Sequence, residues 1–402
     1  AGFGTAAGSA ELNVGIGREA LMNINDGDNN TAIGYQAGKD ISDGTENTLG
    51  GYLAGHNLTD GSYNTVLGTK ALGAGTTASR NVAIGYHAML EFVQGDTRNT
   101  AVGMYAMHRT ESGSHNVAMG YNAMAGANSS YDSDYNVAIG SSTMYANEGG
   151  DYNTVVGYAA GNAITTGGDN VLIGSQAGYA MTTQSAATLV GYKAGLNNTA
   201  SSLVAIGKNA AYSNTSGGEN VAIGFQAAFA NQTSDQNTII GYNAAQNMTA
   251  GYNTFVGHNA GHDLTTGQYN VLMGVSAGAN ITGSEQNVIL GAYAGRMLQA
   301  SKRLIAIGYE AGYMAPTGYQ VAIGHAALRN PTTATENVAL GNEALNGAGS
   351  STSNYNTAIG NYTLSQITSA ERNVAVGYKA LQVTTTGDDN VAVGIYAGDA
   401  IT

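Results

Sequence analysis

Tyrosine is the side chain in this sequence with the clearest capacity for binding, since the chain has 25 Tyr but only 5 Phe and no Trp. Nine tyrosines directly follow the glycine of a recurrent short motif: Tyr35, Tyr52, Tyr86, Tyr121, Tyr158, Tyr192, Tyr242, Tyr309 and Tyr378. Exposed phenol rings can stack on sugar rings and form hydrogen bonds through their hydroxyls. We therefore name these nine residues as candidate glycan-binding residues. The alternative is that the rings only pack on one another between neighbouring strands.

Acidic turns and a histidine pair are the other candidates for chemistry. Turns such as Asp26-Gly27-Asp28-Asn29 offer carboxylate oxygens to Ca²⁺. They lack the regular nonapeptide of calcium-binding rolls, which favours ordinary turn chemistry. His258 and His262 would face one metal only on a helix, and the sequence around them predicts none. No Asp or Glu pair stands out as a general acid and base, so we expect no cofactor, no metal site and no catalytic residue.

The overall composition excludes several classes of protein. The chain of 402 residues has 59 Gly and only 10% charged residues, unlike an ordinary globular enzyme. It has no Cys, which rules out disulfides, iron–sulfur clusters and thiolate zinc sites. The formal net charge is −13 with only 14 Lys and Arg, so we expect no nucleic-acid partner. No apolar run approaches the about 18 residues of a membrane span, so we expect no membrane insertion.

One short motif recurs along the sequence: Asn, then Val or Thr, two apolar residues and Gly, with Ala three residues later. Its glycine occurs 23 times between Gly17 and Gly394, most often 17 residues apart. Four or five β-favouring residues bounded by Gly and polar residues predict a short strand rather than a helix. The sequence therefore predicts an all-β fold, a repetitive parallel β-roll or β-solenoid of about 23 coils with a 17-residue period.

The copies form one uninterrupted array. Residues 1–12 are a partial leading segment and residues 13–402 a continuous solenoid, which we interpret as a fragment of a longer chain. Coils stacked in register would place the motif asparagines about 4.8 Å apart, as a hydrogen-bonded amide ladder. The expected ladder residues include Asn30, Asn47, Asn64, Asn81, Asn99, Asn116, Asn136, Asn153 and Asn170.

The predicted strands are apolar on both faces, which indicates burial on both. Motif positions two and four, counted from the Asn, point to one side, and we expect that side to be the interior of the coil. Position three then points outward, where an identical chain could cover it. We therefore expect a homo-oligomer, and specifically a trimer around a fibre axis. The expected interface residues are Leu49, Val66, Leu172, Phe255 and Ile289.

The motif resembles repeats of known fibrous proteins. The segment Asn30-Thr31-Ala32-Ile33-Gly34-Tyr35-Gln36-Ala37-Gly38 resembles the repeats of bacteriophage tail fibres and related virion fibres. The form Asn81-Val82-Ala83-Ile84-Gly85 also resembles the head repeats of trimeric autotransporter adhesins. The resemblance covers residues 13–402. The adhesin heads form left-handed parallel β-rolls in an interlocked homotrimer, so the resemblance implies such an assembly.

The expected function is therefore mechanical and adhesive rather than enzymatic. We expect a structural or adhesive extracellular fibre, a virion or phage tail-fibre shaft involved in host attachment, whose external partner is a host-surface glycan or receptor. The alternative is the head of a bacterial surface adhesin of the trimeric autotransporter type. A third interpretation is a polysaccharide-degrading tailspike enzyme. The expected location is accordingly the virion surface or the bacterial cell surface.

Overall fold

The computed structural model describes residues 9–93, 95, 97–126, 132–298, 302–315, 318–330, 333–347 and 352–399. The chain divides into two compact units, Ala1–Leu203 and Val204–Thr402. Residues 1–8 of the expected leading segment lie outside the described residues. All regular elements in the described ranges are strands, so no helix there is long and apolar enough to cross a membrane. The prediction of an all-β parallel solenoid with a 17-residue period is confirmed.

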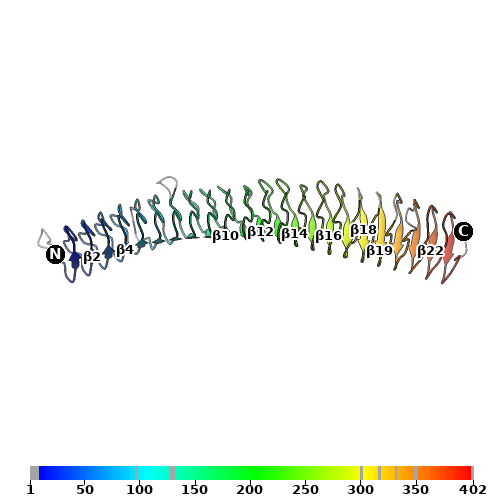
Figure 1. The fold of residues 1–402 in the computed structure, drawn as a ribbon, viewed down its shortest axis with the longest axis horizontal. Helices are drawn as coiled ribbons and strands as arrows, with labels where there is room; N and C mark the ends of the chain where they lie inside the picture. Colours follow the sequence, from blue (N-terminus) through cyan, green and yellow to red (C-terminus); the bar gives the residue numbers. More distant parts are fainter. Residues whose placement is uncertain are drawn as a thin grey trace. The chain divides into compact units, whose positions relative to one another are not determined.

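Each strand is short and belongs to one coil. Within each unit the strands lie side by side (Figure 1). In the first unit they are β1 (Val14–Ile16), β2 (Thr31–Ile33), β3 (Thr48–Gly50), β4 (Thr65–Leu67), β5 (Val82–Ile84), β6 (Thr100–Val102), β7 (Val117–Met119), β8 (Val137–Ile139), β9 (Thr154–Val156), β10 (Val171–Ile173) and β11 (Thr188–Val190). In the second unit they are β12 (Val204–Ile206), β13 (Val221–Ile223), β14 (Thr238–Ile240), β15 (Thr254–Val256), β16 (Val271–Met273), β17 (Val288–Leu290), β18 (Leu304–Ile307), β19 (Gln320–Ile323), β20 (Val338–Leu340), β21 (Thr357–Ile359), β22 (Val374–Val376) and β23 (Val391–Val393).

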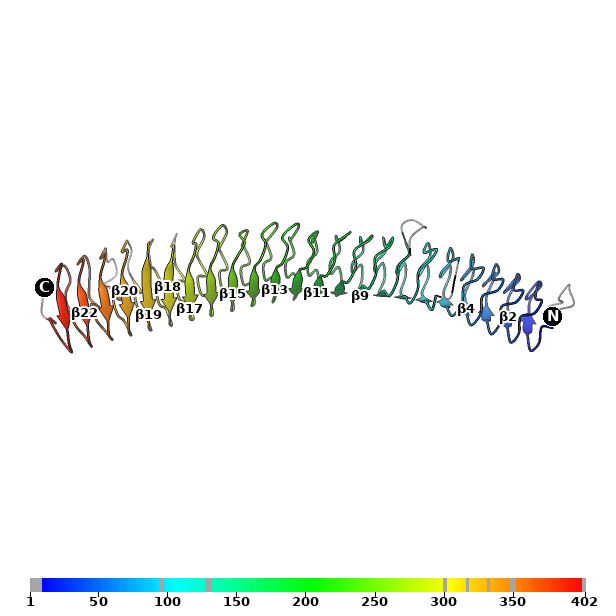
Figure 2. The same cartoon turned by 180° about the vertical axis from the view of Figure 1, so that it is seen from behind.

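Neighbouring strands within a unit are parallel and pair without any shift of the motif. In the first unit Ala32 of β2 pairs with Leu49 of β3, the same motif position one coil later. In the second unit Ala222 of β13 pairs with Ile239 of β14 in the same way. The arrows of each unit keep one direction when seen from behind (Figure 2). Each motif position therefore forms a column along its unit, with a spacing of about 4.8 Å.

The motif glycine is required by the close approach of neighbouring coils. Gly34 has a φ of 142°, and a side chain there would overlap the carbonyl group of Gly51 in the next coil. Gly257, with a φ of 143°, meets Gly274 in the same way. Residues other than glycine rarely adopt this φ, and here they would also lack space. The glycine column thus fixes the turn that ends each strand.

Position three of the motif, not positions two and four, faces the interior of the coil. Position three is buried in every strand except β1, where it is Gly15, whereas positions two and four are exposed or half-buried throughout. The expectation that positions two and four point inward is therefore wrong. Apolar residues on both faces do not reveal which face is inside. The motif Asn decides it, because position one lies on the same face as position three and its amide is bonded inside the coil.

The five residues expected at an interface between chains are core residues of their own coils. Leu49, Val66, Leu172, Phe255 and Ile289 are each at most 1% exposed. Their coil and its neighbours already cover them, so they cannot meet another chain without unfolding. The expectation that an identical chain covers these five side chains is wrong.

Large and small interior residues compensate each other within a coil. In the coil of β15, the large Phe255 is followed by Gly261, where an added Cβ would lie 2.7 Å from Phe255 Cε2. In the coil of β5, position three is Ala83 and the residue equivalent to Gly261 is the fully buried Met89. These two coils thus each combine one large and one small residue at this pair of positions, as close packing favours. The coil of β12 instead holds alanine at both, Ala205 and Ala211.

Candidate functional site

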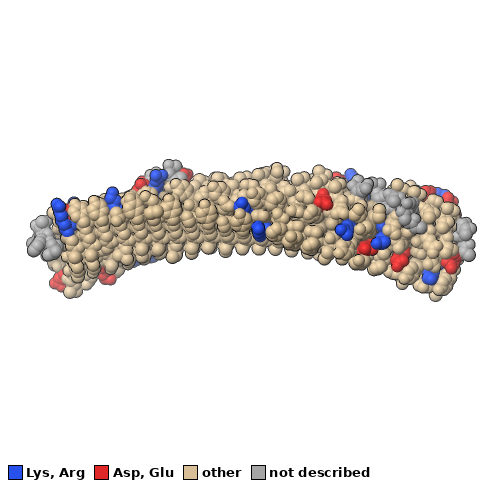
Figure 3. All heavy atoms as spheres, in the orientation of Figure 1, with Lys and Arg blue, Asp and Glu red and all other residues tan. Residues whose placement is uncertain are grey.

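The outward side of the strands, which we call the strand face, consists of motif positions two and four. Position two is Val, Thr or Ile in all 23 strands, and position four is Ile, Val, Leu or Met except at Gly50. Neither position holds a charged residue. Ile33 and Ile139 on this face remain 48% and 38% exposed. The scarcity of charge is general, as Figure 3 shows for one side of the molecule, and each unit presents a largely aliphatic strip to solvent.

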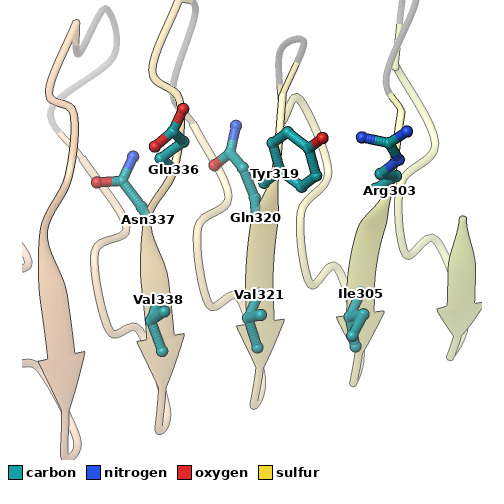
Figure 4. A pocket seen from close by; sticks show the side chains of 8 residues that line it. All are labelled: Arg303, Ile305, Tyr319, Gln320, Val321, Glu336, Asn337 and Val338. Carbon is teal, nitrogen blue, oxygen red and sulfur yellow. The ribbon is translucent and has the colours of Figure 1, made fainter.

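A hollow of about 460 Å³ lies on the strand face of the second unit. Its floor is a row of Ile305, Val321 and Val338, one from each of β18, β19 and β20 (Figure 4). Arg303 and Tyr319 lie at its rim, with the Arg303 guanidinium carbon 4.8 Å from the centre of the Tyr319 ring. An aliphatic floor with a polar rim is the arrangement found at the centre and edge of protein–protein interfaces.

The tyrosines that follow the motif glycine lie mostly on the surface. The exposed fraction ranges from 40% at Tyr378 to 61% at Tyr158, whereas Tyr35 is half-buried. Tyr35 and Tyr52 occupy consecutive coils and stack, with ring centres 5.3 Å apart. In most other coils the next residue of the column is not Tyr. The exposed members therefore belong to short aromatic groups rather than to one continuous row, and they are Tyr52, Tyr86, Tyr121, Tyr158, Tyr192, Tyr242, Tyr309 and Tyr378.

A second aromatic column lies at the residue before the motif asparagine. His115, Tyr135 and Tyr152 stack with ring centres 4.8 and 5.1 Å apart. Tyr252 and Tyr269 stack at 5.2 Å in the second unit. These stacks show that many rings do pack on one another between coils, as the alternative interpretation held. Their outer edges remain open, since Tyr152 is still 59% exposed.

Five rings from three consecutive coils form a cluster: Tyr86, His87, Tyr105, His108 and Tyr121. Tyr105 meets Tyr86 edge-on at 5.5 Å and His108 at 5.0 Å, and it approaches Tyr121 at 6.3 Å. Desolvation and the neighbouring His108 lower the pKa of His87. Desolvation and the nearby Tyr86 raise the pKa of Tyr105. The sequence prediction named only the residue directly after the motif glycine, so it did not include His87, Tyr105 and His108. His87 and Tyr105 each lie two residues after the motif glycine in successive coils, which is a pattern visible in the sequence.

A hollow of about 280 Å³ adjoins this cluster and is lined by Tyr105, His108, Arg109, Tyr121 and Asn122, among others. The Nδ1 atom of His108 is buried and has no hydrogen-bond partner among the described residues. Arg109 is exposed, and its guanidinium forms no ion pair or hydrogen bond with a described residue. None of the lining residues belongs to a strand. The hollow therefore lies on the turns and away from the strand face.

The acidic turns use their carboxylates as acceptors for the backbone of the preceding coil. Asp28 Oδ1 accepts a hydrogen bond from the N–H of Glu11. Asp151 Oδ1 accepts one from the N–H of Asp134, with an N···O distance of 2.7 Å. No group of three His, Asp or Glu that could hold a metal occurs in the described ranges. These carboxylates thus form a second ladder between coils, which the sequence analysis of turns did not identify.

One acidic turn is also paired with a cation. Arg372 Nε lies 2.7 Å from Asp389 Oδ1, and Arg372 Nη2 lies 3.7 Å from Asp388 Oδ2. The hydrogen bond from Arg372 lowers the pKa of Asp389. This turn therefore already has a positive partner from its own chain.

The two histidines considered as a metal pair interact with different partners. His258 stacks on Tyr242, with ring centres 5.2 Å apart. His262 Nδ1 lies 2.6 Å from Asp263 Oδ1. Each imidazole ring therefore contacts a different neighbouring side chain, and the contacts do not join the two histidines into a pair.

The motif asparagines form an amide ladder inside the coils. Asn47 Nδ2 donates to Asn30 Oδ1 at 2.9 Å and to the Gly61 carbonyl at 2.9 Å. The backbone N–H of Asn47 donates to the same Asn30 oxygen at 3.0 Å. This backbone contact repeats at Asn64, Asn81, Asn99, Asn116, Asn136, Asn153 and Asn170. Because the amides satisfy one another and the turn carbonyls, their role is structural.

Comparison with known protein families and with curated proteins finds no match to this chain.

Proposed function

We propose that the chain is the shaft of an extracellular attachment fibre in which identical chains associate through their strand faces. The observation that carries this proposal is the strand face itself, which holds no charged residue in any of the 23 strands. Soluble monomers rarely expose contiguous apolar patches larger than a few hundred Å². Parallel sheets occur almost only where both of their faces are covered. An aliphatic strip without charge is therefore typical of a surface that another chain covers.

We propose three chains around one axis. In a cyclic trimer each strand face packs against the other two, so no aliphatic strip remains open to water. The resemblance of the motif to virion-fibre and trimeric adhesin repeats also supports an assembly of three chains. The hollow above Ile305, Val321 and Val338 then receives aliphatic side chains of a neighbouring chain.

The turns provide the surface for attachment. Tyrosines such as Tyr52 and Tyr158, which are 50% and 61% exposed, offer repeated platforms for sugar rings. Contacts that are weak individually can add up through avidity when one glycan chain or cell surface spans several of them. The external partner in this proposal is accordingly a host-surface glycan or receptor.

The biological class that we propose first is a virion or phage tail-fibre shaft, and the second is the head of a bacterial surface adhesin. The dominant 17-residue period differs from the shorter head repeat of the adhesins, which favours the virion fibre. The complete gene separates the two classes. A C-terminal tip or chaperone domain supports a virion fibre, whereas a coiled-coil stalk followed by a short membrane barrel supports an adhesin.

The assembly is tested by sedimentation equilibrium of the purified chain and of the double variant Ile139→Asp/Ile173→Asp. Both positions lie on the strand face and are 38% and 39% exposed in the single chain. The wild type should sediment with three chain masses and the variant with one, because charges on this face lose their hydration in the trimer. The matched control Tyr158→Asp/Tyr192→Asp places the same two charges on turns, at residues that are 61% and 45% exposed, and should remain trimeric. A wild-type chain that stays monomeric and soluble overturns the proposal.

A further inference from the structure

We propose that the hollow beside the aromatic cluster binds an anionic sugar, one that carries a carboxylate or a sulfate group. This inference rests on the proposed attachment function and names the class of ligand at one site on the turns. The hollow takes Tyr105, His108 and Arg109 from the coil of β6, and Tyr121 and Asn122 from the coil of β7. Because it uses no strand residue, it stays open when the strand faces associate.

The positive charge of Arg109 is not paired with any residue that the structure describes. The chain carries a formal net charge of −13, and its few cations are mostly engaged. Arg329, for example, lies 2.6 Å from Glu310 and over the ring of Tyr313. Arg109 is exposed and makes no such contact with a described residue. A guanidinium presents paired N–H donors that match the geometry of a carboxylate or a sulfate.

His108 adds a second polar group to the same hollow. Its Nδ1 atom is buried without a hydrogen-bond partner among the described residues. Buried polar atoms are normally satisfied, so an unsatisfied one at the wall of a hollow indicates a missing partner. The ring is held in place by Tyr105 at 5.0 Å and by His87 at 5.8 Å. His108 is thus a lining residue with a ring nitrogen that no described residue uses for a hydrogen bond.

The remaining lining suits a sugar ring rather than a free inorganic anion. Tyr105 and Tyr121 meet at an angle of 70°, so the hollow offers both a ring face and a ring edge. Sugar C–H groups pack on aromatic faces, while the phenol hydroxyls and the Asn122 amide can bond to sugar hydroxyls. A hollow of about 280 Å³ is large enough for one monosaccharide unit but not for a long oligosaccharide.

The test measures binding of three hexasaccharides to the assembled protein by isothermal titration calorimetry: one sulfated, one containing a uronic or sialic acid, and one neutral. At least one acidic hexasaccharide should bind about tenfold more tightly than the neutral one, and Arg109→Ala should remove that advantage. The control Arg18→Ala also removes one exposed positive charge, outside the hollow, and should leave the affinities unchanged. Inorganic sulfate alone should bind more weakly than the sulfated sugar, since it cannot use the rings.

Tighter binding of the sulfated hexasaccharide would identify a sulfate as the ligand group, and tighter binding of the one with a uronic or sialic acid would identify a carboxylate. Either result supports the inference. Equal binding of acidic and neutral sugars, or an Arg109→Ala variant that binds like the wild type, overturns it. Equal losses in Arg109→Ala and Arg18→Ala also overturn it, because they indicate unspecific attraction of charge. A trimer that binds no acidic sugar refutes this inference and leaves the proposed fibre intact. A monomeric wild type refutes the proposed fibre by itself, whatever the sugar binding.

Discussion

The strand face and the turns follow the same coil geometry, yet their side chains differ in kind. On the strand face, positions two and four hold only aliphatic residues, Thr and Met, apart from Gly50. Among the turns, the residue after the motif glycine is Tyr in nine coils and varies widely in the rest, including Lys208, His258 and Asn342. The β-propensity of Val, Ile and Thr explains part of the uniformity. It does not explain why no charged side chain occurs on an exposed strand. This difference is what we expect if another chain covers the strand face, as we propose, while the residue after the motif glycine stays open to solvent and can vary.

The largest effect should come from a charge placed on the inner side of a strand. Leu172→Asp buries a carboxylate at a position that is 0% exposed, which should cost about 5 kcal/mol or more. Thermal unfolding followed by circular dichroism should show a clear loss of stability. Ile173→Asp, the next residue on the strand face, should weaken the assembly but leave the coil folded, so it should lower the unfolding temperature much less than Leu172→Asp does. Similar unfolding of the two variants would contradict the assignment of inside and outside.

The next largest effect tests volume compensation in the core. Phe255→Ala should cost about 3–5 kcal/mol, because it leaves a cavity in a closely packed coil. Adding Gly261→Met should recover part of this loss, since the coil of β5 combines Ala83 with the buried Met89. Gly261→Met alone should destabilise, because its side chain would meet Phe255. A double-mutant cycle by denaturant unfolding measures the coupling, and simple additivity would refute compensation.

A smaller effect is expected from one break in the amide ladder. Asn153→Ala removes bonds to Asn136 and to the Gly167 carbonyl, and it removes the oxygen that accepts from both the backbone N–H and the amide of Asn170. Loss of buried hydrogen bonds of this kind should cost about 1–3 kcal/mol. The control Asn197→Ala changes an exposed asparagine and should be close to neutral. Chemical unfolding curves that coincide for both variants would mean that the ladder is not a source of stability.

The smallest effect on stability, but a direct effect on binding, is expected on the turns. The triple variant Tyr86→Ala/Tyr121→Ala/Tyr158→Ala should lose no more than about 1 kcal/mol per ring contact and should still assemble. Its binding to host cells or to a glycan array should fall, because three exposed aromatic rings are removed. Unchanged binding would show that the turns of this chain are passive and that attachment belongs elsewhere.

The period, the strand type and the columns could be predicted from the sequence, because Gly34 and its equivalents recur at a fixed spacing and the strands are too short for helices. Which face of the strand points into the coil could not be predicted in the same way. Val171, Leu172 and Ile173 are all apolar, so this strand gives no contrast between a polar and an apolar face, and alternation alone left both orientations open. The information was in Asn47, whose amide must lie inside the coil if it is to bond to Asn30.

The candidate site was predictable only in part, for a related reason. The column that holds Tyr86 and Tyr121 is visible in the sequence, and so are its interruptions. The contact of Tyr105 with His108 depends on how the turn after Gly103 folds within one coil, which the spacing does not specify. The second ladder, formed by carboxylates such as Asp151, likewise needs the register of the coils before its acceptors can be recognised.

The most direct test of the account compares the accessibility of single cysteines on the two surfaces. The chain has no native Cys, so Ile173→Cys and Tyr158→Cys each introduce one reporter thiol, and Leu172→Cys provides a buried control. In the single chain the native side chains at the first two positions are 39% and 61% exposed, so both thiols should react with a maleimide. In the assembled fibre we predict that the thiol at position 173 is protected like the one at 172, while the thiol at 158 still reacts. Equal reaction at positions 173 and 158 in the native protein would contradict the claim that the strand face joins identical chains.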